Sequence, residues 1–218
     1  MIHNDAIKSA DDLRDYFSVS RETVEALEIY GKKIVVWQRA LNLVASKTLP
    51  DKWHRHFADS LQLLDCAPAE FSSFADFGSG GGFPGLVLAI ALRDLHPRAK
   101  LHLVESDQRK SAFLRDVART LKLQVNIQST RIEADATGNA IGLVDLISAR
   151  ALAPLDRLFQ LIHPFCHAST VAVLPKGKSV DDEIALARQR WTFDLELRRS
   201  RTDPDGRIAI VRDLRPGV

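Results

Sequence analysis

A glycine-rich run, DFGSGGGFPG at residues 76–85, contains the residue types that point most directly to ligand chemistry. Glycine permits tight turns and lets a ligand approach backbone N–H groups closely. Two overlapping fingerprints fit the run. Gly80, Gly82 and Gly85 match G-x-G-x-x-G, which binds dinucleotides after a strand and before a helix. Alternatively, the G-x-G-x-G spacing that starts at Gly78 is the usual loop for S-adenosylmethionine.

An acidic residue follows the run at a suitable distance. Glu105 lies 20 residues after Gly85, at the end of the next predicted strand. A carboxylate there can accept hydrogen bonds from both ribose hydroxyls of an adenosine. Pro84 suits the first turn of a helix, where no N–H is needed. These features favour an adenosine-containing ligand and leave the choice between NAD and S-adenosylmethionine open.

The first part of the chain, residues 1–68, is predicted to be a helical region packed on the core. Apolar residues spaced three and four apart predict a helix over Glu22–Ala45, with Ser20 as its N-cap. A second helix is expected over Lys52–Leu64, and Pro68 closes the region.

The remaining residues, 69–218, alternate between strand-like and helical patterns, which predicts a mostly parallel sheet with helices on both faces. The expected strands are Phe71–Phe77, Lys100–Glu105, Gln124–Gln128, Val144–Ser148, Thr170–Leu174, Phe193–Arg199 and Arg207–Arg212. The expected helices are Gly85–Leu95, Gln108–Leu121, Leu155–Pro164 and Val180–Gln189, with an irregular loop after Gln128. The turn residues Pro204-Asp205-Gly206 join the last two strands, which must therefore form an antiparallel hairpin.

The composition is typical of a globular protein and argues against a membrane-spanning or disulfide-rich one. The chain has 218 residues, of which 45% are hydrophobic and 27% charged, and its longest apolar run, Leu86–Leu92, is too short to span a membrane. The polar N-terminus is not a secretory signal, so the cytoplasm is the expected compartment. Two cysteines make no disulfide framework. The net charge of +2 permits nucleic-acid binding without requiring it.

Short motifs in a fixed order make the chain resemble the RsmG (GidB) family of 16S ribosomal RNA guanine-N7 methyltransferases. The matching pieces are Asn42-Leu43, RHFADS at 55–60, the glycine run, Glu105, KSAFL at 110–114, RIE at 131–133, SARALAPL at 148–155 and LPKG at 174–177. The departures are small: Val44 stands where a threonine is common, and Ser148-Ala149-Arg150 replaces a tighter Ile-Ser-Arg.

The resemblance implies a Rossmann-like class I S-adenosylmethionine-dependent methyltransferase fold: a mostly parallel seven-stranded α/β sheet that ends in an antiparallel hairpin, with an N-terminal helical extension. It favours S-adenosylmethionine over NAD, with S-adenosylhomocysteine as the product. Gly85 then becomes the place where the following helix packs close to the sheet. The implied substrate is a guanine of the 530 loop of 16S rRNA, position 527 in the standard numbering. The expected partner is this RNA, the small subunit or its precursor, with no DNA, no membrane and a monomeric enzyme.

The family's site residues transfer onto matching positions of this chain. The expected cofactor contacts are Gly78, Ser79, Gly80, Gly82, Phe83, Glu105, Ile132, Glu133 and Arg150. Arg150 is also the expected substrate-orienting residue, with a surface ion pair as the alternative. No general base is expected, because guanine N7 carries a lone pair and no proton.

Cations that could grip RNA are spread along the sequence. The candidates are Arg55, His56, Lys110, Lys176, Arg198, Arg199 and Arg201. His56 and Asp59 lie on one predicted helix face, and a buried pair that joins the N-terminal helices to the core is the other interpretation of them. Such phosphate contacts would make binding fall steeply with salt.

Other functions find less support. His163, Cys166 and His167 form H-x-x-C-H, but no second Cys/His pair has suitable spacing, so no metal site is expected. A nicotinamide-dependent oxidoreductase rests on the glycine fingerprint alone. A non-catalytic RNA-binding or assembly factor that keeps a relic of the loop is the third hypothesis.

Overall fold

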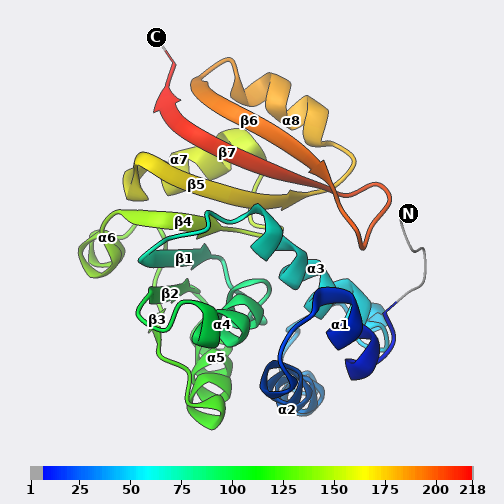
Figure 1. The fold of residues 1–218 in the computed structure, drawn as a ribbon. Coiled ribbons are helices and arrows are strands. Elements are labelled where there is room, and N and C mark those ends of the chain that lie inside the picture. The colour runs from blue at the N-terminus through cyan, green and yellow to red at the C-terminus, as the bar shows by residue number, and fades with distance from the viewer. Residues whose placement is uncertain (1–6, 218) are drawn as a thin grey trace.

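A seven-stranded sheet forms the centre of the protein in the computed structural model, which describes residues 7–217 (Figure 1). Residues 1–6, part of the polar N-terminus and of the predicted 1–68 region, lie outside the described residues. The spatial order of the strands is β3-β2-β1-β4-β5-β7-β6. The strands are β1 (Ser73–Phe77), β2 (Lys100–Val104), β3 (Val125–Gln128), β4 (Val144–Ser148), β5 (Cys166–Lys176), β6 (Trp191–Arg199) and β7 (Arg207–Pro216).

The terminal hairpin is present as predicted. β7 inserts between β5 and β6 and pairs antiparallel with both, whereas the pairs among β1 to β5 are parallel. The turn is closed by backbone bonds from Gly206 N to Asp203 O (3.0 Å) and from Ser200 N to Gly206 O (3.1 Å). The predicted fold class, a mostly parallel sheet ending in an antiparallel hairpin, is confirmed.

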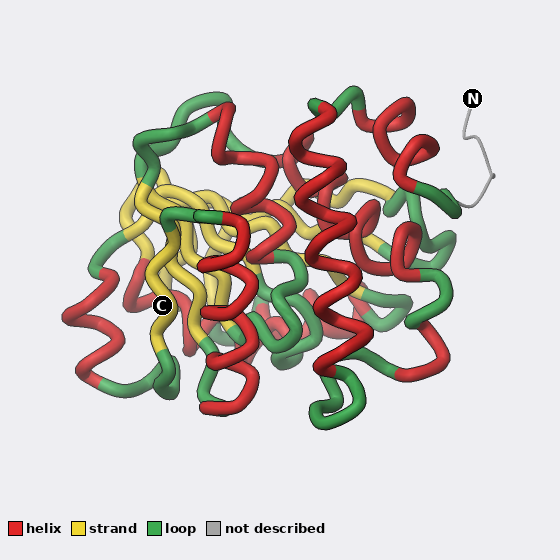
Figure 2. Tube along the Cα trace, turned by 90° about the horizontal axis from the view of Figure 1, so that it is seen from below, coloured by secondary structure: helices red, strands yellow, loops and turns green. Residues whose placement is uncertain are grey.

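Helices cover both faces of the sheet, as the alternating pattern predicts (Figures 1 and 2). One face packs against α4 (Gly85–Leu95) and α5 (Gln108–Leu121), and their apolar residues share a core with Phe74 of β1. The other face packs against α7 (Leu155–Ile162), η4 (His163–Phe165) and α8 (Val180–Ala187). No helix within residues 7–217 is both long and apolar enough to cross a bilayer.

The N-terminal helices extend the α4/α5 layer (Figure 2). They are α1 (Ala10–Phe17), α2 (Arg21–Trp37), η1 (Ser46–Thr48), η2 (Trp53–Ala58), α3 (Asp59–Leu61) and η3 (Gln62–Cys66). Asp116 of α5 ties α2 down, because it accepts from Lys33 Nζ (2.7 Å) and Trp37 Nε1 (3.1 Å). Buried residues of α2 belong to the same core cluster as α4 and β1, so this region packs on the sheet.

The predicted helix Glu22–Ala45 is too long. Ser20 caps α2 as expected, accepting from Thr23 N, but the helix ends at Trp37. The side chain of Gln38 accepts hydrogen bonds from Leu43 N and Val44 N and donates to Val44 O. These bonds satisfy the backbone outside a helix, so the apolar residues of the segment pack from a loop.

Two further segments differ from the prediction. The helix expected over Lys52–Leu64 is divided into a π-helical segment, η2, a short α-helix, α3, and a 3-10 helix, η3. The loop expected after Gln128 contains a short helix, α6 (Asp135–Ile141). Thr137 is fully buried there, and its hydroxyl donates to Arg131 O, which holds a turn that local propensity does not reveal.

Candidate functional site

The loops at the carboxyl ends of the parallel strands form two adjoining pockets, where ligands bind in open α/β sheets. The smaller pocket has a volume of ≈ 420 Å³ and is lined by the loops after β1, β2 and β3. The larger one has a volume of ≈ 760 Å³ and lies between the N-terminal helices, the loop after β4 and the terminal hairpin. Ala151 and Leu152 line both pockets.

Gly78 and Gly80 provide the backbone wall of the smaller pocket. Both have left-handed φ values, +72° and +55°. A Cβ at Gly80 would meet a single heavy atom, Gly78 O at 3.8 Å, so this position faces open space where a ligand can approach the backbone. A Cβ at Gly78 would lie 2.7 Å from Leu152 Cδ1, so Leu152 packs directly on the loop.

The other glycines of the run serve packing. A Cβ at Gly82 would collide with the hydroxyl of Tyr30, and one at Gly85 would collide with the carboxylate of Asp76. Gly85 is thus where α4 packs close to the sheet, as predicted. Gly82 does not line the smaller pocket, and neither do Ser79 and Phe83, which are buried.

Two buried polar residues hold the glycine loop from behind. Tyr30 of α2 is fully buried, donates to Gly81 O and stacks on Phe83 with ring centroids 5.4 Å apart. Asp76 accepts from Ser148 Oγ (2.6 Å) and Gly85 N (3.2 Å). Burial raises the pKa of Asp76 to about 6. The loop is therefore fastened to α2 on one side and to β4 on the other.

Glu105 is buried at the rim of the smaller pocket. Its Oε2 accepts from Gly80 N (2.8 Å) and its Oε1 from Asp107 N (2.7 Å), so backbone N–H groups fix the orientation of the carboxylate. Each oxygen retains a lone pair for a further donor. Ile132 and Glu133 also line this pocket, and so does Lys110, which the sequence analysis places among the RNA contacts.

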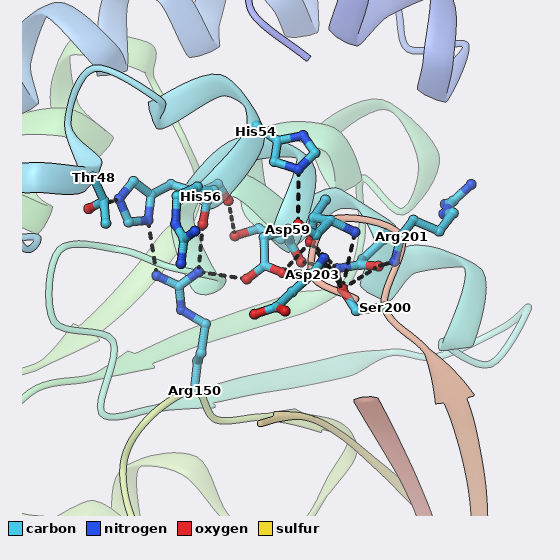
Figure 3. A network of polar contacts seen from close by, with 12 residues as sticks. Thr48, His54, His56, Asp59, Arg150, Ser200, Arg201 and Asp203 are labelled. Atoms are coloured by element: carbon cyan, nitrogen blue, oxygen red, sulfur yellow. Dashed lines mark hydrogen bonds and ion pairs between the residues drawn. The ribbon is translucent and has the colours of Figure 1, made fainter. Parts of the chain in front are cut away.

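Arg150 lies in the larger pocket and does not line the smaller one. Its Nη1 donates to Asp59 Oδ2 at 2.8 Å and makes a longer contact with Arg55 O at 3.4 Å, and its Nη2 donates to His56 Nδ1 at 3.1 Å (Figure 3). The guanidinium also lies 5.5 Å from the Phe83 ring centroid. The predicted pairing of His56 with Asp59 is replaced by their joint hold on Arg150.

His56 lines the larger pocket, and its lowered pKa makes the ring neutral near pH 7, so an RNA contact stays a prediction but would not be a cationic one. Burial, and to a smaller extent the neighbouring charges of Arg150 and Arg55, lower its pKa to about 4. Because a guanidinium can only donate, Nδ1 of His56 must accept. The ring proton therefore sits on Nε2, which lies 2.9 Å from Thr48 Oγ1. The hydroxyl of Thr48 accepts this bond and in turn donates its own hydrogen bond to Ala45 O (2.7 Å), so both ring nitrogens of His56 have a partner.

The other predicted RNA cations differ in whether their side chains are already bonded within the protein or are exposed. Lys176 lines the larger pocket, and its Nζ is buried between Glu183 (2.8 Å) and Ala153 O (2.8 Å), so its contact with RNA stays a prediction. Arg198 donates to Asp65 O, and Arg201 pairs with Asp65 and lies over the Phe17 ring at 4.9 Å. Arg199 is exposed and has no ion-pair partner within residues 7–217, and Arg55 lines the larger pocket.

Comparison with known proteins identifies the family. A family model described as GidB, rRNA small subunit methyltransferase G, matches residues 23–202. The chain belongs to this family. Curated relatives named "Ribosomal RNA small subunit methyltransferase G" include one from Parvibaculum lavamentivorans, 47% identical over 90% of this chain and 86% of that protein. Another, from Methylobacterium nodulans, is 44% identical over 90% of this chain and 92% of the relative.

Solved structures support the fold of this family. A TehB-like SAM-dependent methyltransferase from Corynebacterium glutamicum has a TM-score of 0.56 at 14% identity and covers 85% of this chain and 99% of its own. The SAH-bound methyltransferase PaMTH1 from Podospora anserina has a TM-score of 0.58 at 14% identity, with 93% and 94% coverage. Family and fold together confirm a Rossmann-like S-adenosylmethionine-dependent methyltransferase, as the motifs indicate, and favour it over an oxidoreductase.

Sequence reasoning missed several residues that build the site. Tyr30 looks like one apolar residue of a helix face, yet it bonds to the glycine loop. Leu152 separates the pockets, and Gln62 and Thr202 complete the hydrogen bonds of Asp59. Within the sequence, only the position of Leu152 two residues after Arg150 could have signalled its role, because the other residues come from distant segments.

Proposed function

We propose that this chain transfers a methyl group from S-adenosylmethionine to N7 of a guanine in the 16S rRNA of the small ribosomal subunit, in the 530 loop. The observation that carries the proposal is the junction of the two pockets. The smaller pocket has the glycine wall and acid that suit the cofactor, and the larger one places Arg150 directly beside it. Leu152 and Ala151 mark the boundary that the methyl group must cross.

The residues of the smaller pocket fit the cofactor. The pocket's volume of ≈ 420 Å³ is in the range of small-molecule sites. Gly78 and Gly80 offer backbone to its amino-acid part, Glu105 has free lone pairs for ribose hydroxyls, and Ile132 offers an apolar surface to adenine. When bound, S-adenosylmethionine supplies an electrophilic methyl group on sulfur.

Methyl transfer to guanine N7 needs no residue that removes a proton. The attacking nitrogen already carries a lone pair, so the protein's task is to hold the base in line at near-contact distance. His56 is not arranged as a base, because its Nδ1 is occupied by Arg150 and its Nε2 carries the proton. Asp59 offsets the charge of Arg150, which limits repulsion of the positive charge that N7 gains.

Arg150 has donors left for the substrate. Its three hydrogen bonds to Asp59, His56 and the Arg55 carbonyl leave Nε–H and one Nη2–H without a partner in residues 7–217. Arginine commonly donates to guanine O6 and to phosphate. We assign Arg150 to O6 or to phosphate, because N7 itself must stay free to attack.

The remaining predictions on substrate and organisation belong to the same proposal. Residues 69–218 act as the methyltransferase domain, and the helical region within 1–68 completes the larger pocket through Arg55, His56 and Asp59. The enzyme acts as a cytoplasmic monomer on the small subunit or its precursor. Comparing naked 16S rRNA with assembled subunits as substrates, and measuring the mass of the enzyme by light scattering, tests both statements.

The decisive experiment is methyl transfer from tritiated S-adenosylmethionine to small subunits from cells that lack this enzyme. Incorporation into 16S rRNA, with 7-methylguanosine found after nuclease digestion and mass spectrometry, is the expected result. Subunits from wild-type cells, already methylated, should accept little. Incorporation at another atom or into another RNA would contradict the assignment. S-adenosylhomocysteine binding without any incorporation would favour the non-catalytic alternative.

The exposed Arg199 tests the RNA surface. We expect Arg199→Ala to weaken RNA binding a few-fold and to reduce the slope of log affinity against log salt by about 1, as for the loss of one phosphate contact. Arg215→Ala is the matched control, since Arg215 is an exposed arginine at the far end of the hairpin. Equal salt slopes for Arg199→Ala and the unmodified protein would remove Arg199 from the interface.

A further inference from the structure

The loop between β6 and β7 lies against η2 and η3, at the end of the N-terminal helical region and far from the loop in sequence (Figure 3). Gln62 of η3 is buried, and its Oε1 accepts from Arg201 N at 2.8 Å. The Nε2 of His54 donates to Thr202 O at 2.9 Å. The backbone of this loop is thus held in place by two side chains of the helical region.

The side chain of Thr202 makes a different kind of contact. Its hydroxyl donates to Asp59 Oδ1 at 2.6 Å, and Gln62 Nε2 approaches the same oxygen at 3.0 Å. The other oxygen of Asp59 accepts from Arg150 Nη1 at 2.8 Å. A hydrogen-bonded path therefore runs from the hairpin loop through Asp59 to the arginine of the larger pocket.

The path has a mechanical consequence. A carboxylate bonded on one oxygen can rotate about its terminal torsion, which is broad and roughly two-fold. Hydrogen-bond donors on Oδ1 fix the plane of the Asp59 carboxylate. The position of Oδ2, which accepts from Arg150, is then fixed as well. Thr202 itself lines neither of the two pockets. Its hydroxyl contacts Asp59, Gln62 and Ser200, and of these three side chains Asp59 is the one that bonds to Arg150.

We propose that Thr202 is a positioning residue for methyl transfer, which sets the orientation of Arg150 through the carboxylate of Asp59. The inference rests on the proposed function, since it presupposes that Arg150 orients the target guanine. It makes the terminal hairpin part of the catalytic apparatus as well as part of the sheet. Thr202, Asp59 and Arg150 come from three segments whose relative placement only the fold defines.

Thr202→Val and Thr202→Ser test the proposal as a matched pair. Valine keeps the shape of threonine without the hydroxyl, and serine keeps the hydroxyl. We expect Thr202→Val to lower kcat for methyl transfer about five- to tenfold, the size of one ordinary net hydrogen bond, with S-adenosylhomocysteine affinity unchanged. Thr202→Ser should stay within about twofold of the unmodified enzyme. Unchanged kcat in Thr202→Val, or equal losses in both variants, would overturn the proposal.

A double-mutant cycle with Arg150→Lys separates positioning from general destabilisation. If Thr202 acts through Arg150, Thr202→Val should change the activity of the Arg150→Lys enzyme by less than about twofold, because the geometry it protects is already lost. Effects that multiply would contradict the proposal. Thr202→Ala replaces valine if that variant folds poorly, as judged by its thermal midpoint. Methyl transfer by the unmodified enzyme is measured alongside, so failure of the proposed function would show separately.

Discussion

The two pockets that meet at Leu152 are built by different means. The smaller one is lined mainly by the short segments that follow β1, β2 and β3, with backbone exposed at Gly78 and Gly80. The larger one is lined by residues from four segments far apart in the sequence, within 43–62, 150–154, 175–183 and 200–208. The smaller pocket therefore depends mainly on chain geometry at the strand ends, whereas the larger pocket depends on how distant elements dock.

Their polar groups follow the same division. In the smaller pocket, backbone N–H groups hold the carboxylate of Glu105. In the larger pocket, Arg150 is held by the side chains of Asp59 and His56. Substitutions should therefore separate into those that affect cofactor affinity and those that affect transfer.

Replacing Arg150 should have the largest effect. We expect Arg150→Ala to lower kcat for methyl transfer by about 100-fold or more, because a misplaced reactant costs roughly that much. S-adenosylhomocysteine affinity, measured by calorimetry, should change less than about twofold, since Arg150 does not line the smaller pocket. A parallel loss of cofactor affinity would mean that the two pockets are not separable at this residue.

Gly80→Val should have the opposite profile. A β-branched side chain at φ +55° is strained and would project into the cofactor pocket. We expect S-adenosylhomocysteine affinity to fall about tenfold or more, with RNA binding retained. The matched control is Gly138→Val in α6, where a Cβ meets nothing within 4 Å and φ is not positive. Comparable loss in both variants would show that backbone geometry at Gly80 is not special.

The pH dependence of stability should differ in sign between the two regions. The pKa of His56 is lowered from 6.5 to about 4, so the unfolded chain binds the proton first as pH falls. Stability is lost as pH falls from about 6.5 to 4. The pKa of Asp76 is raised from 3.8 to about 6, so stability is lost as pH rises through that window.

The measurement compares urea unfolding of the unmodified protein with His56→Gln and Asp76→Asn between about pH 4 and 7. The stability difference relative to His56→Gln should grow with rising pH, and that relative to Asp76→Asn should shrink. Each change should be on the order of 2–3 kcal/mol, since the pKa of each group lies more than two pH units from its ordinary value. Slopes of the same sign in both comparisons would refute the contrast.

Leu152→Ala should give the smallest and least selective effect. Leu152 lines both pockets and packs on Gly78, so its truncation should lower cofactor affinity and kcat together, each about two- to fivefold. Leu143→Ala, at a leucine that is 58% exposed, is the control and should leave both unchanged. An effect of Leu152→Ala on one quantity alone would assign this residue to one pocket.

The sequence by itself was enough to predict what depends on neighbouring residues. The glycine run, Glu105 at the end of β2, the alternation of strands and helices, and the Pro204-Asp205-Gly206 turn all lie within short windows, and the structure confirms each of these elements. The helices α4 and α5 have the predicted bounds. In these segments, the turn residues and the spacing of apolar residues favour the same local structure that the tertiary fold contains.

Only the tertiary structure decided which polar residues work together. The end of α2 at Trp37 depends on Gln38 bonding to a later loop. The neutral state of His56 follows from its burial beside Arg150, which no spacing in the sequence reveals. Thr202 reaches Asp59 across 143 positions of the chain. Hydrogen bonds over such separations exist because the β6–β7 loop and the end of the N-terminal helical region meet beside the carboxyl ends of the parallel strands.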